Sequence, residues 1–289
     1  MKTANNPASL VRILARDQAR LVEALGLDQR EGRLEAQVLL AKALGVNRAY
    51  LIAHAEDIPD EALLSHYHAM LERRIAGEPV AYILGEREFY GLRFKVSPAV
   101  LIPRPETELL VELALARIPA DSPIRILDLG TGSGAIAISL AKQRPNAFVV
   151  GLDQSGQALR VAQSNATALQ ASNVAFVRSD WFSGLSVRKF DIVVSNPPYI
   201  PDLDPHLLQG DLRFEPRSAL AAGADGLDCV RRIACEAAQY LSPGGWLMIE
   251  HAYNQADKVA ALYRQAGFSA INAIRDLSGI ERVTIGKLA

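Results

Sequence analysis

From residue 124 onward the chain alternates strand-like and helix-like segments, and this alternation limits the folds it can adopt. Short runs of branched aliphatic residues are typical of buried strands, and the segments between them have helical spacing of apolar residues. The expected strands are residues 125–129, 148–152, 174–178, 191–195 and 246–250, with a terminal strand pair at 270–275 and 282–286. The expected helices are residues 135–142, 155–169, 227–241 and 254–266. The pattern predicts an α/β fold with a doubly wound, mostly parallel sheet and an antiparallel terminal strand.

A glycine-rich loop, Gly130-Thr131-Gly132-Ser133-Gly134, follows the first of these strands and precedes a helix. Glycines allow a tight turn and a close approach of a ligand to the backbone. Asp153 ends the next strand, where its carboxylate can accept hydrogen bonds from the hydroxyls of a ribose. Loop and carboxylate together predict a nucleoside cofactor, and their spacing fits both NAD and S-adenosylmethionine.

Asp128 favours S-adenosylmethionine over NAD, and two further side chains are candidates to border the adenine. Asp128 precedes Gly130 by two residues, where a carboxylate would repel a pyrophosphate but can attract a cationic amine. Asp180 and Trp181 follow the third strand, where the carboxylate can accept from an adenine amino group and the indole can line the base. Ordinary core packing is an equally good explanation for Trp181.

The turn Asn196-Pro197-Pro198-Tyr199 follows the strand at residues 191–195. Proline has no backbone N–H, so the strand must end here, and the residue before a proline is held in an extended conformation. The turn therefore presents a side-chain amide, backbone carbonyls and an aromatic ring at the end of a rigid strand. We expect Asn196, Pro197 and Tyr199 to hold a substrate that donates hydrogen bonds. A hydride-transfer enzyme would give this turn no role.

Residues 8 to about 76 have helical periodicity instead. Gly26 and Gly45 are candidate helix ends, and Asn47 and Asp60 are candidate helix starts. Because helices of this length are marginal alone, we expect them to pack into a small bundle.

The chain is accordingly divided into three parts. We expect an N-terminal helical domain at residues 1–76, a β-hairpin linker at 77–103 and the sheet domain at 104–289. The strands expected in the linker are Val80–Leu84 and Phe89–Val96, with Gly85 and Gly91 as turn residues.

Composition narrows the class of protein. Hydrophobic residues make up 49% and charged residues 22%, as in soluble globular proteins, and a net charge of −1 indicates no basic nucleic-acid clamp by composition, with a local basic patch left open. Cys229 and Cys235 have no metal-binding spacing, so we expect neither a disulfide nor a metal. No apolar run approaches the ~20 residues of a membrane span and no signal peptide is visible, which predicts a cytoplasmic protein without membrane contact.

Motifs along nearly the whole chain resemble the release factor glutamine methyltransferases of the HemK/PrmC type. They are residues 78–85, 89–92, 101–108, the glycine loop, 179–182, 195–200 and 214–220. The segment Pro103–Glu108 separates the chain from the otherwise similar ribosomal-protein glutamine methyltransferases.

The resemblance implies a Rossmann-like class I methyltransferase whose N-terminal domain recognises the substrate. It implies methyl transfer from S-adenosylmethionine to the side-chain N5 of the glutamine in the Gly-Gly-Gln motif of class I peptide chain release factors. Carried over by position, Gly130–Gly134, Asp153, Trp181 and Asn196 would contact the cofactor. Asn196–Tyr199, which includes Pro198, would hold the glutamine.

An amide nitrogen is a poor nucleophile because its lone pair is delocalised. If the Asn196 side-chain oxygen and the Pro197 carbonyl each accept one substrate N–H, both favour the tetrahedral geometry of the transition state. Tyr199 would stack on the amide plane. The proton can leave after methyl transfer, so no general base is assigned.

Other functions stay open at this point. An adenine-N6 nucleic-acid methyltransferase could use the same turn, but would need a base-flipping surface and phosphate contacts. A ribosomal-protein glutamine methyltransferase, a non-catalytic binding module and an NAD enzyme are the further alternatives.

Overall fold

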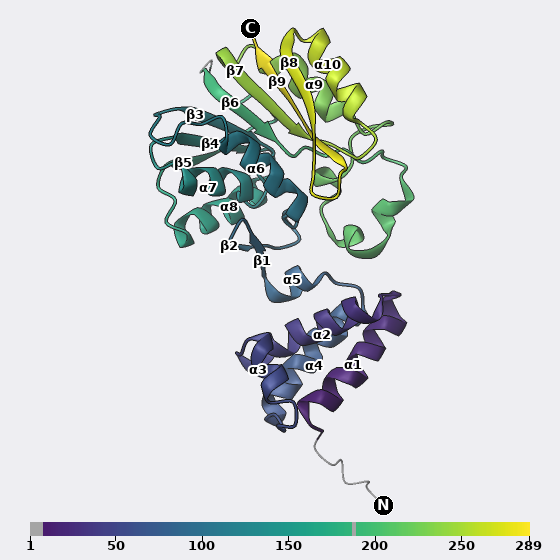
Figure 1. The fold of residues 1–289 in the computed structure, drawn as a ribbon. Coiled ribbons are helices and arrows are strands. Elements are labelled where there is room, and N and C mark those ends of the chain that lie inside the picture. Colours follow the sequence, from purple (N-terminus) through teal and green to yellow (C-terminus); the bar gives the residue numbers. More distant parts are fainter. Residues whose placement is uncertain (1–7, 187–188) are drawn as a thin grey trace, which may run out of the picture. The chain divides into compact units, whose positions relative to one another are not determined.

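The computed structural model describes residues 8–186 and 189–289 of the 289-residue chain. The chain divides into two compact units, Met1–Gly85 and Glu86–Ala289. The described part of the first unit consists of helices, and the second unit is built on a seven-stranded sheet (Figure 1).

The first unit is a small helical bundle, as the sequence predicts. Its helices are α1 Leu10–Leu25, α2 Gln29–Leu44, α3 Arg48–Ala53, α4 Glu61–Ile75 and α5 Val80–Leu84. Gly26 and Gly45, in left-handed conformation, end α1 and α2. The side chains of Asn47 and Asp60 accept backbone N–H groups at the starts of α3 and α4. These ends and starts confirm the predicted helix boundaries.

The core of this unit is formed by one face of each long helix. Leu39 and Leu40 of α2 are fully buried against Leu10 and Ile13 of α1 and Tyr67 of α4. Burying a leucine side chain stabilises a fold by about 1.5–3 kcal/mol relative to exposing it. Packing of these faces therefore supplies stability that the separate helices lack.

The strand expected at Val80–Leu84 is wrong, because this segment forms helix α5. The Pro79 carbonyl accepts from the backbone N–H groups of Tyr82 and Ile83, both at 3.0 Å, and Gly85 ends the helix in left-handed conformation. Ile83 packs into the core of the helical unit. Burial against neighbouring helices thus outweighs the strand propensity of the β-branched residues.

A β-hairpin is present, but its two strands are closer to each other in the sequence than expected. Strands β1 Glu86–Phe89 and β2 Leu92–Lys95 pair antiparallel across Tyr90 and Gly91, both with positive φ. Phe89 and Phe94 are buried in a core cluster of the sheet unit. Residues 77–85 of the expected linker are therefore part of the helical unit, and residues 86–103 are part of the sheet unit.

The sheet confirms the predicted mostly parallel α/β fold. Its spatial order is β5-β4-β3-β6-β7-β9-β8, with the first five strands parallel and β9 antiparallel to both of its neighbours. The strands are β3 Arg125–Leu129, β4 Phe148–Asp153, β5 Val174–Arg178, β6 Phe190–Ser195, β7 Leu241–Glu250, β8 Phe268–Arg275 and β9 Glu281–Leu288.

Helices cover both faces of the sheet (Figure 1). They are α6 Glu108–Leu115, α7 Ala135–Gln143, α8 Gly156–Ala168, α9 Asp228–Ala237 and α10 Ala256–Gln265, with short 3₁₀ helices η1 Pro105–Thr107, η2 Pro205–Leu208, η3 Gly210–Phe214 and η4 Arg217–Ala219. The helix expected over residues 227–241 ends at Ala237, because Leu241 already pairs with Phe190 in the sheet.

Alternate strand residues face the two layers of helices. Ile126 packs with α6, α7 and α8, whereas its neighbour Leu127 packs with α9 and α10. Successive residues face opposite sides of the sheet, and helices cover both sides, so the strands appear in the sequence as continuous apolar runs. None of the helices in residues 8–186 and 189–289 is long and apolar enough to cross a membrane.

The chain leaves β3 toward β4 and β5 on one side, and then returns to place β6 on the other side. Ligands of such sheets bind outside the carboxyl ends of the strands at this switch of direction. The fold thus directs attention to the ends of β3, β4 and β6.

Replacing Leu40 by Ala is expected to destabilise the helical unit by about 2–5 kcal/mol, because the side chain is fully buried and leaves a cavity. Hydrogen exchange of the full chain should become faster in α1, α2 and α4. Leu34→Ala on the same helix, where the side chain is 42% exposed, is the matched control and should change exchange little. Equal exchange in the two variants would contradict this description of the core.

Candidate cofactor and substrate site

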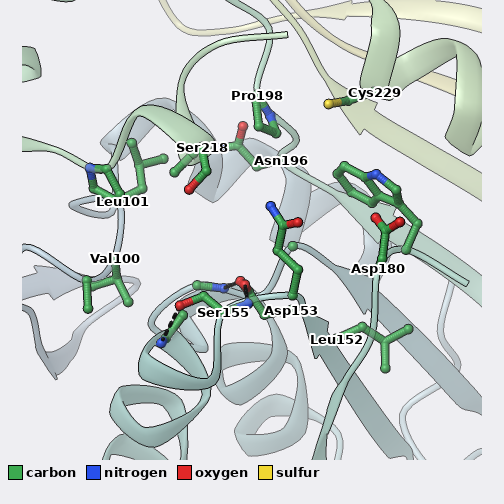
Figure 2. Close-up of a pocket in the computed structure, with 18 of the residues that line it drawn as sticks. Val100, Leu101, Leu152, Asp153, Ser155, Asp180, Asn196, Pro198, Ser218 and Cys229 are labelled. Carbon is green, nitrogen blue, oxygen red and sulfur yellow. Dashed lines mark hydrogen bonds between the residues drawn. The ribbon is translucent and has the colours of Figure 1, made fainter. Parts of the chain in front are cut away.

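The carboxyl ends of the parallel strands surround a cavity of about 350 Å³, a size typical of small-molecule sites. The expected site residues that line it are Gly130, Gly132, Asp153, Asp180, Trp181, Asn196 and Pro198. Figure 2 shows Asn196 and Pro198 across the cavity from Asp153 and Ser155, with Asp180 on another side. The tertiary structure thus brings together motifs that follow four different strands.

Left-handed backbone shapes the glycine loop. Gly130, Gly132 and Gly134 have φ values of 72°, 54° and 81°, which other residues rarely adopt. A Cβ on Gly130 would point toward the Trp181 ring at 3.8 Å, into space that a ligand would need. A Cβ on Gly134 would lie 3.2 Å from the Ala162 Cβ, so glycine here lets α7 pack closely on α8.

The sequence also predicts cofactor contacts for Thr131, Ser133 and Gly134, but none of the three lines the cavity. The Thr131 hydroxyl donates to Asp128 at 2.6 Å, and the Ser133 carbonyl accepts from Asn165 at 2.9 Å. Thr131 and Ser133 are buried and stabilise the loop from behind.

Asp153 fastens the glycine loop to the neighbouring strand. Its Oδ2 accepts from the Gly132 backbone N–H at 3.0 Å, and its Oδ1 accepts from the Ser155 N–H at 2.8 Å. Burial raises the pKa of Asp153, and these two hydrogen bonds oppose the rise. Each carboxylate oxygen keeps a second lone pair, so the group can accept the two hydrogen bonds that a ribose would donate.

Asp128 is fully buried and does not line the cavity. Its Oδ2 accepts from Thr131, whereas its Oδ1 has no hydrogen-bond partner within the described part of the chain. Burial raises the pKa of Asp128 to about 7, against the opposing effect of the Thr131 hydrogen bond. The expected contact between Asp128 and a cationic amine stays a prediction.

Asp180 and Trp181 border the cavity, and each has a structural contact as well. Arg232 donates to Asp180 Oδ2 at 2.8 Å. Trp181 has a φ of 50°, uncommon outside glycine, and its carbonyl accepts from the Ser179 hydroxyl at 2.6 Å. The Trp181 ring also packs against the core shared with α9 and α10. Trp181 therefore both borders the cavity and contributes to core packing.

Asn196 carries the most informative polar atom of the site. Its Nδ2 donates to Thr107 Oγ1 at 3.0 Å. Its Oδ1 is buried and, among residues 8–186 and 189–289, has no hydrogen-bond partner. Because buried polar atoms are almost always paired, an unpaired acceptor beside a cavity indicates a position for a ligand donor.

Of the other residues of the turn, only one borders the cavity. Pro198 lines the cavity, whereas Pro197 and Tyr199 do not. Burial raises the pKa of Tyr199, and the nearby Glu250 acts in the same direction. Stacking of Tyr199 on a substrate amide therefore stays a prediction.

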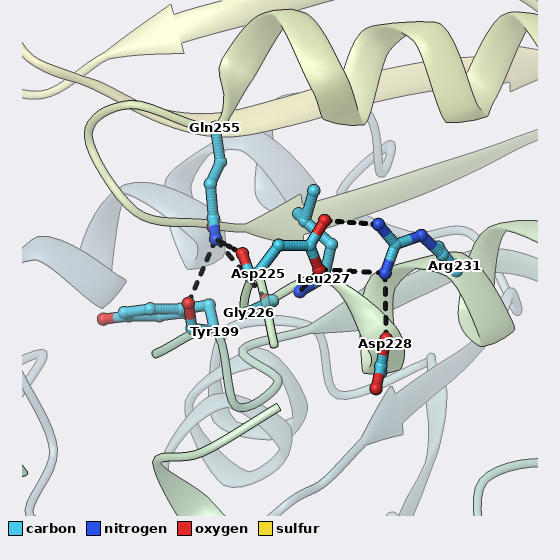
Figure 3. Close-up of polar contacts among 7 residues, drawn as sticks. All are labelled: Tyr199, Asp225, Gly226, Leu227, Asp228, Arg231 and Gln255. Atoms are coloured by element: carbon cyan, nitrogen blue, oxygen red, sulfur yellow. Dashed lines mark hydrogen bonds and ion pairs between the residues drawn. The ribbon is translucent and has the colours of Figure 1, made fainter. Parts of the chain in front are cut away.

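A buried glutamine braces the turn from the far side (Figure 3). Gln255 Nε2 donates to the Tyr199 carbonyl at 3.0 Å and to the carbonyls of Asp225 and Gly226 at 3.4 Å, while Oε1 accepts from the Ala252 N–H at 3.0 Å. A Cβ on Gly226 would lie 2.2 Å from the backbone carbonyl oxygen of Tyr199. Sequence reasoning missed Gln255, because no local pattern marks it.

An ion pair joins two segments that are distant in sequence. Arg104 pairs with Glu215, whose Oε2 also accepts from the Ile102 N–H at 3.0 Å. Burial raises the pKa of Glu215, and Arg104 opposes the rise. The pair joins the expected motifs at residues 101–108 and 214–220, and residues of both segments line the cavity.

Comparison with known proteins agrees with this geometry. Residues 120–278 match a family model described as a methyltransferase domain, and residues 18–85 match the PrmC N-terminal domain. A T. thermophilus 16S rRNA methyltransferase, solved with AdoMet and guanosine, shares the fold with a TM-score of 0.54 and 21% identity, over 71% of this chain and 50% of that one. Fold and site together define a methyltransferase that uses S-adenosylmethionine.

Curated relatives identify the family. The release factor glutamine methyltransferase of Xylella fastidiosa is 48% identical over 90% of this chain and 94% of that protein. That of Salmonella typhimurium is 47% identical over the same shares. The chain belongs to the release factor glutamine methyltransferase family, which confirms the resemblance seen in its motifs.

Asp128 should make stability depend on pH. Because its pKa is raised to about 7 on folding, the folded state binds more protons than the unfolded state between about pH 4 and 7. The free energy of unfolding should therefore fall as pH rises through this window.

Asp128→Asn keeps an acceptor for Thr131 but cannot ionise, so it should reduce this slope by up to about 1.4 kcal/mol per pH unit. Urea denaturation at several pH values measures the slope. Glu250, whose pKa is also raised to about 7, should still contribute its own part of the slope in this variant. A slope equal to that of the wild type would contradict the assignment to Asp128.

Proposed function

We propose that the protein transfers a methyl group from S-adenosylmethionine to the side-chain N5 of the glutamine in the Gly-Gly-Gln motif of class I peptide chain release factors. Membership of the family supports the substrate class. The single structural observation that carries the proposal is the buried, unpartnered Oδ1 of Asn196, a residue that lines the cavity.

The residues around the cavity fit the cofactor. Gly130 and Gly132 leave room for a close approach to the backbone, and Asp153 has two lone pairs left for ribose hydroxyls. Trp181 and Asp180 would border the adenine. Bound there, the cofactor would supply an electrophilic methyl group on a sulfonium.

The turn would activate the substrate by hydrogen bonding. Asn196 Oδ1 would accept one N–H of the glutamine carboxamide, and the Pro197 carbonyl would accept the other. Both acceptors favour positive charge on the nitrogen, and such interactions are strengthened in a site shielded from water. Tyr199 would hold the amide plane, and the proton would leave after methyl transfer.

Asn196→Ala should lower kcat by about 10²–10³-fold, the range typical for loss of one transition-state hydrogen bond. Affinity for S-adenosylmethionine, measured by calorimetry, should change much less. Asn146→Ala is the matched control, because Asn146 is exposed just before β4, at the amino ends of the strands and away from the cavity at their carboxyl ends. Near-wild-type methylation by Asn196→Ala would refute the role of its carboxamide.

Asp153→Asn should weaken S-adenosylmethionine binding by about 10–100-fold, because hydrogen bonds to a charged acceptor contribute about 1.5–3 kcal/mol each. The amide nitrogen would also face one of the two backbone N–H groups that the carboxylate now accepts. Isothermal titration measures the affinity. Unchanged binding by a folded variant would rule out a ribose contact at Asp153.

The substrate is tested directly with isotopically labelled cofactor. The wild-type protein is incubated separately with a class I release factor, ribosomal protein, RNA and DNA, and products are located by mass spectrometry. We expect one methyl group on the motif glutamine and none on a release factor whose glutamine is replaced by alanine. Label on nucleic acid or ribosomal protein alone would favour those alternatives.

The helical unit has a place in the same proposal. We assign recognition of the release factor to the N-terminal helical domain, and its match to the PrmC N-terminal domain supports this assignment. Binding of nucleic acid or membrane is not part of the proposed activity. The protein would act in the cytoplasm, where its substrate terminates translation.

A further inference from the structure

Thr107 determines which atom of the Asn196 carboxamide is left unpaired. It ends η1 and is 4% exposed, and its Oγ1 accepts from Asn196 Nδ2 at 3.0 Å. The nitrogen of the carboxamide is therefore turned toward Thr107, and the oxygen is left without a partner among the described residues. The reverse orientation would present N–H donors to a substrate that itself donates.

Glu250 is the last residue of β7, the strand that pairs with β6. Ser195 of β6 pairs with Ile249 of β7, so Asn196 and Glu250 are the next residues along two neighbouring strands. Glu250 is 2% exposed, its Oε2 has no hydrogen-bond partner among the described residues, and the nearby Thr107 hydroxyl lowers its pKa against the larger effect of burial. Glu250 does not line the cavity, so it can act on a ligand only through other residues.

The number of available protons decides which group donates and which accepts in this series of contacts. A carboxylate can only accept hydrogen bonds, and a hydroxyl has one proton to donate. An ionised Glu250 can therefore only accept from the Thr107 hydroxyl, which leaves an Oγ1 lone pair for the Asn196 Nδ2–H. The Asn196 amide must then present its nitrogen to Thr107, which leaves its oxygen available for a substrate donor.

We propose that Thr107 and Glu250 are positioning residues that orient the Asn196 carboxamide for the methylated substrate. The inference rests on the proposed function, since it explains how the acceptor of that site is kept available. Protonated Glu250 can donate to Thr107, which frees the hydroxyl proton for Asn196 Oδ1. That arrangement blocks the acceptor and lowers turnover.

Several charged groups surround Glu250 and influence its ionisation. Arg282 on β9 and Arg104 before η1 favour the carboxylate, whereas Glu106 disfavours it, and the Tyr199 hydroxyl is the other titratable group facing it. Both arginines already pair with other carboxylates, Arg282 with Asp276 and Arg104 with Glu215. Burial therefore has the largest influence, and it raises the pKa of Glu250 to about 7.

The first experiment compares Thr107→Val with Thr107→Ser in the full-length enzyme. Valine keeps the shape and loses the hydroxyl, so kcat should fall by about 10-fold or more while affinity for S-adenosylmethionine stays within about 3-fold. Serine restores the hydroxyl and should restore kcat to within a few-fold of wild type. Wild-type kcat in Thr107→Val, or equal loss in two folded variants, would overturn the inference.

The second experiment measures kcat against pH and does not need the threonine variants to fold. The wild type should lose turnover as pH falls through about 7, where Glu250 becomes protonated. Glu250→Gln should lack this acid-side decline. Asp128→Asn is the comparison variant, because Asp128 also has a raised pKa, near 7, and is expected near the cofactor; its basal kcat can change, but the acid-side decline should persist if Glu250 causes it.

The two variants distinguish the possible outcomes. A decline that persists in Glu250→Gln, or that disappears only in Asp128→Asn, would overturn the role of Glu250. Absence of release factor methylation by the wild type would instead refute the proposed function, so the two failures are separable.

Discussion

Parallel hydrogen bonding of β3 to β4 on one side and to β6 on the other is the constraint on which the site depends. Leu129 is in register with Leu152 and with Ser195. The next residue along each strand is Gly130, Asp153 or Asn196, so glycine loop, carboxylate and carboxamide meet at one edge. A shift of one residue in either pairing would turn these side chains to the other face of the sheet.

Carboxylates that are buried or half-buried lie in and around the site. Burial raises the pKa of Asp128, Asp153, Glu215 and Glu250. Desolvating a carboxylate is unfavourable unless hydrogen bonds or opposite charge compensate, and the compensation is incomplete for Asp128 and Glu250, each with one unpartnered oxygen in the described structure. Such costs are characteristic of functional sites, where groups are held for chemistry rather than for stability.

Rigidity of the Asn196 turn comes from distant segments. Thr107 contacts it from η1, and Gln255 holds the Tyr199 carbonyl from the start of α10. The prolines restrict the backbone locally, and these contacts fix the turn within the fold. A substrate amide would therefore meet acceptors that need no reorganisation, which is the basis of electrostatic catalysis.

Local patterns were sufficient for most of the fold. Apolar periodicity placed β3 and β5 at their observed residues, and glycines and prolines marked the loop at residue 130 and the turn at residue 196. Val80–Leu84 is the clearest exception, because its apolar residues suit a strand and a buried helix equally, and only packing against α2 and α4 decides.

The sequence by itself therefore determined the α/β class, the family and the positions of the glycine loop, Asp153 and Asn196, because backbone preferences depend on neighbouring residues. Only the tertiary structure decided that Thr131 and Ser133 face inward, and that Thr107, Glu250 and Gln255 support the turn. Thr107 and Asn196 are 89 residues apart, and their hydrogen bond exists only once the sheet has brought the chain together.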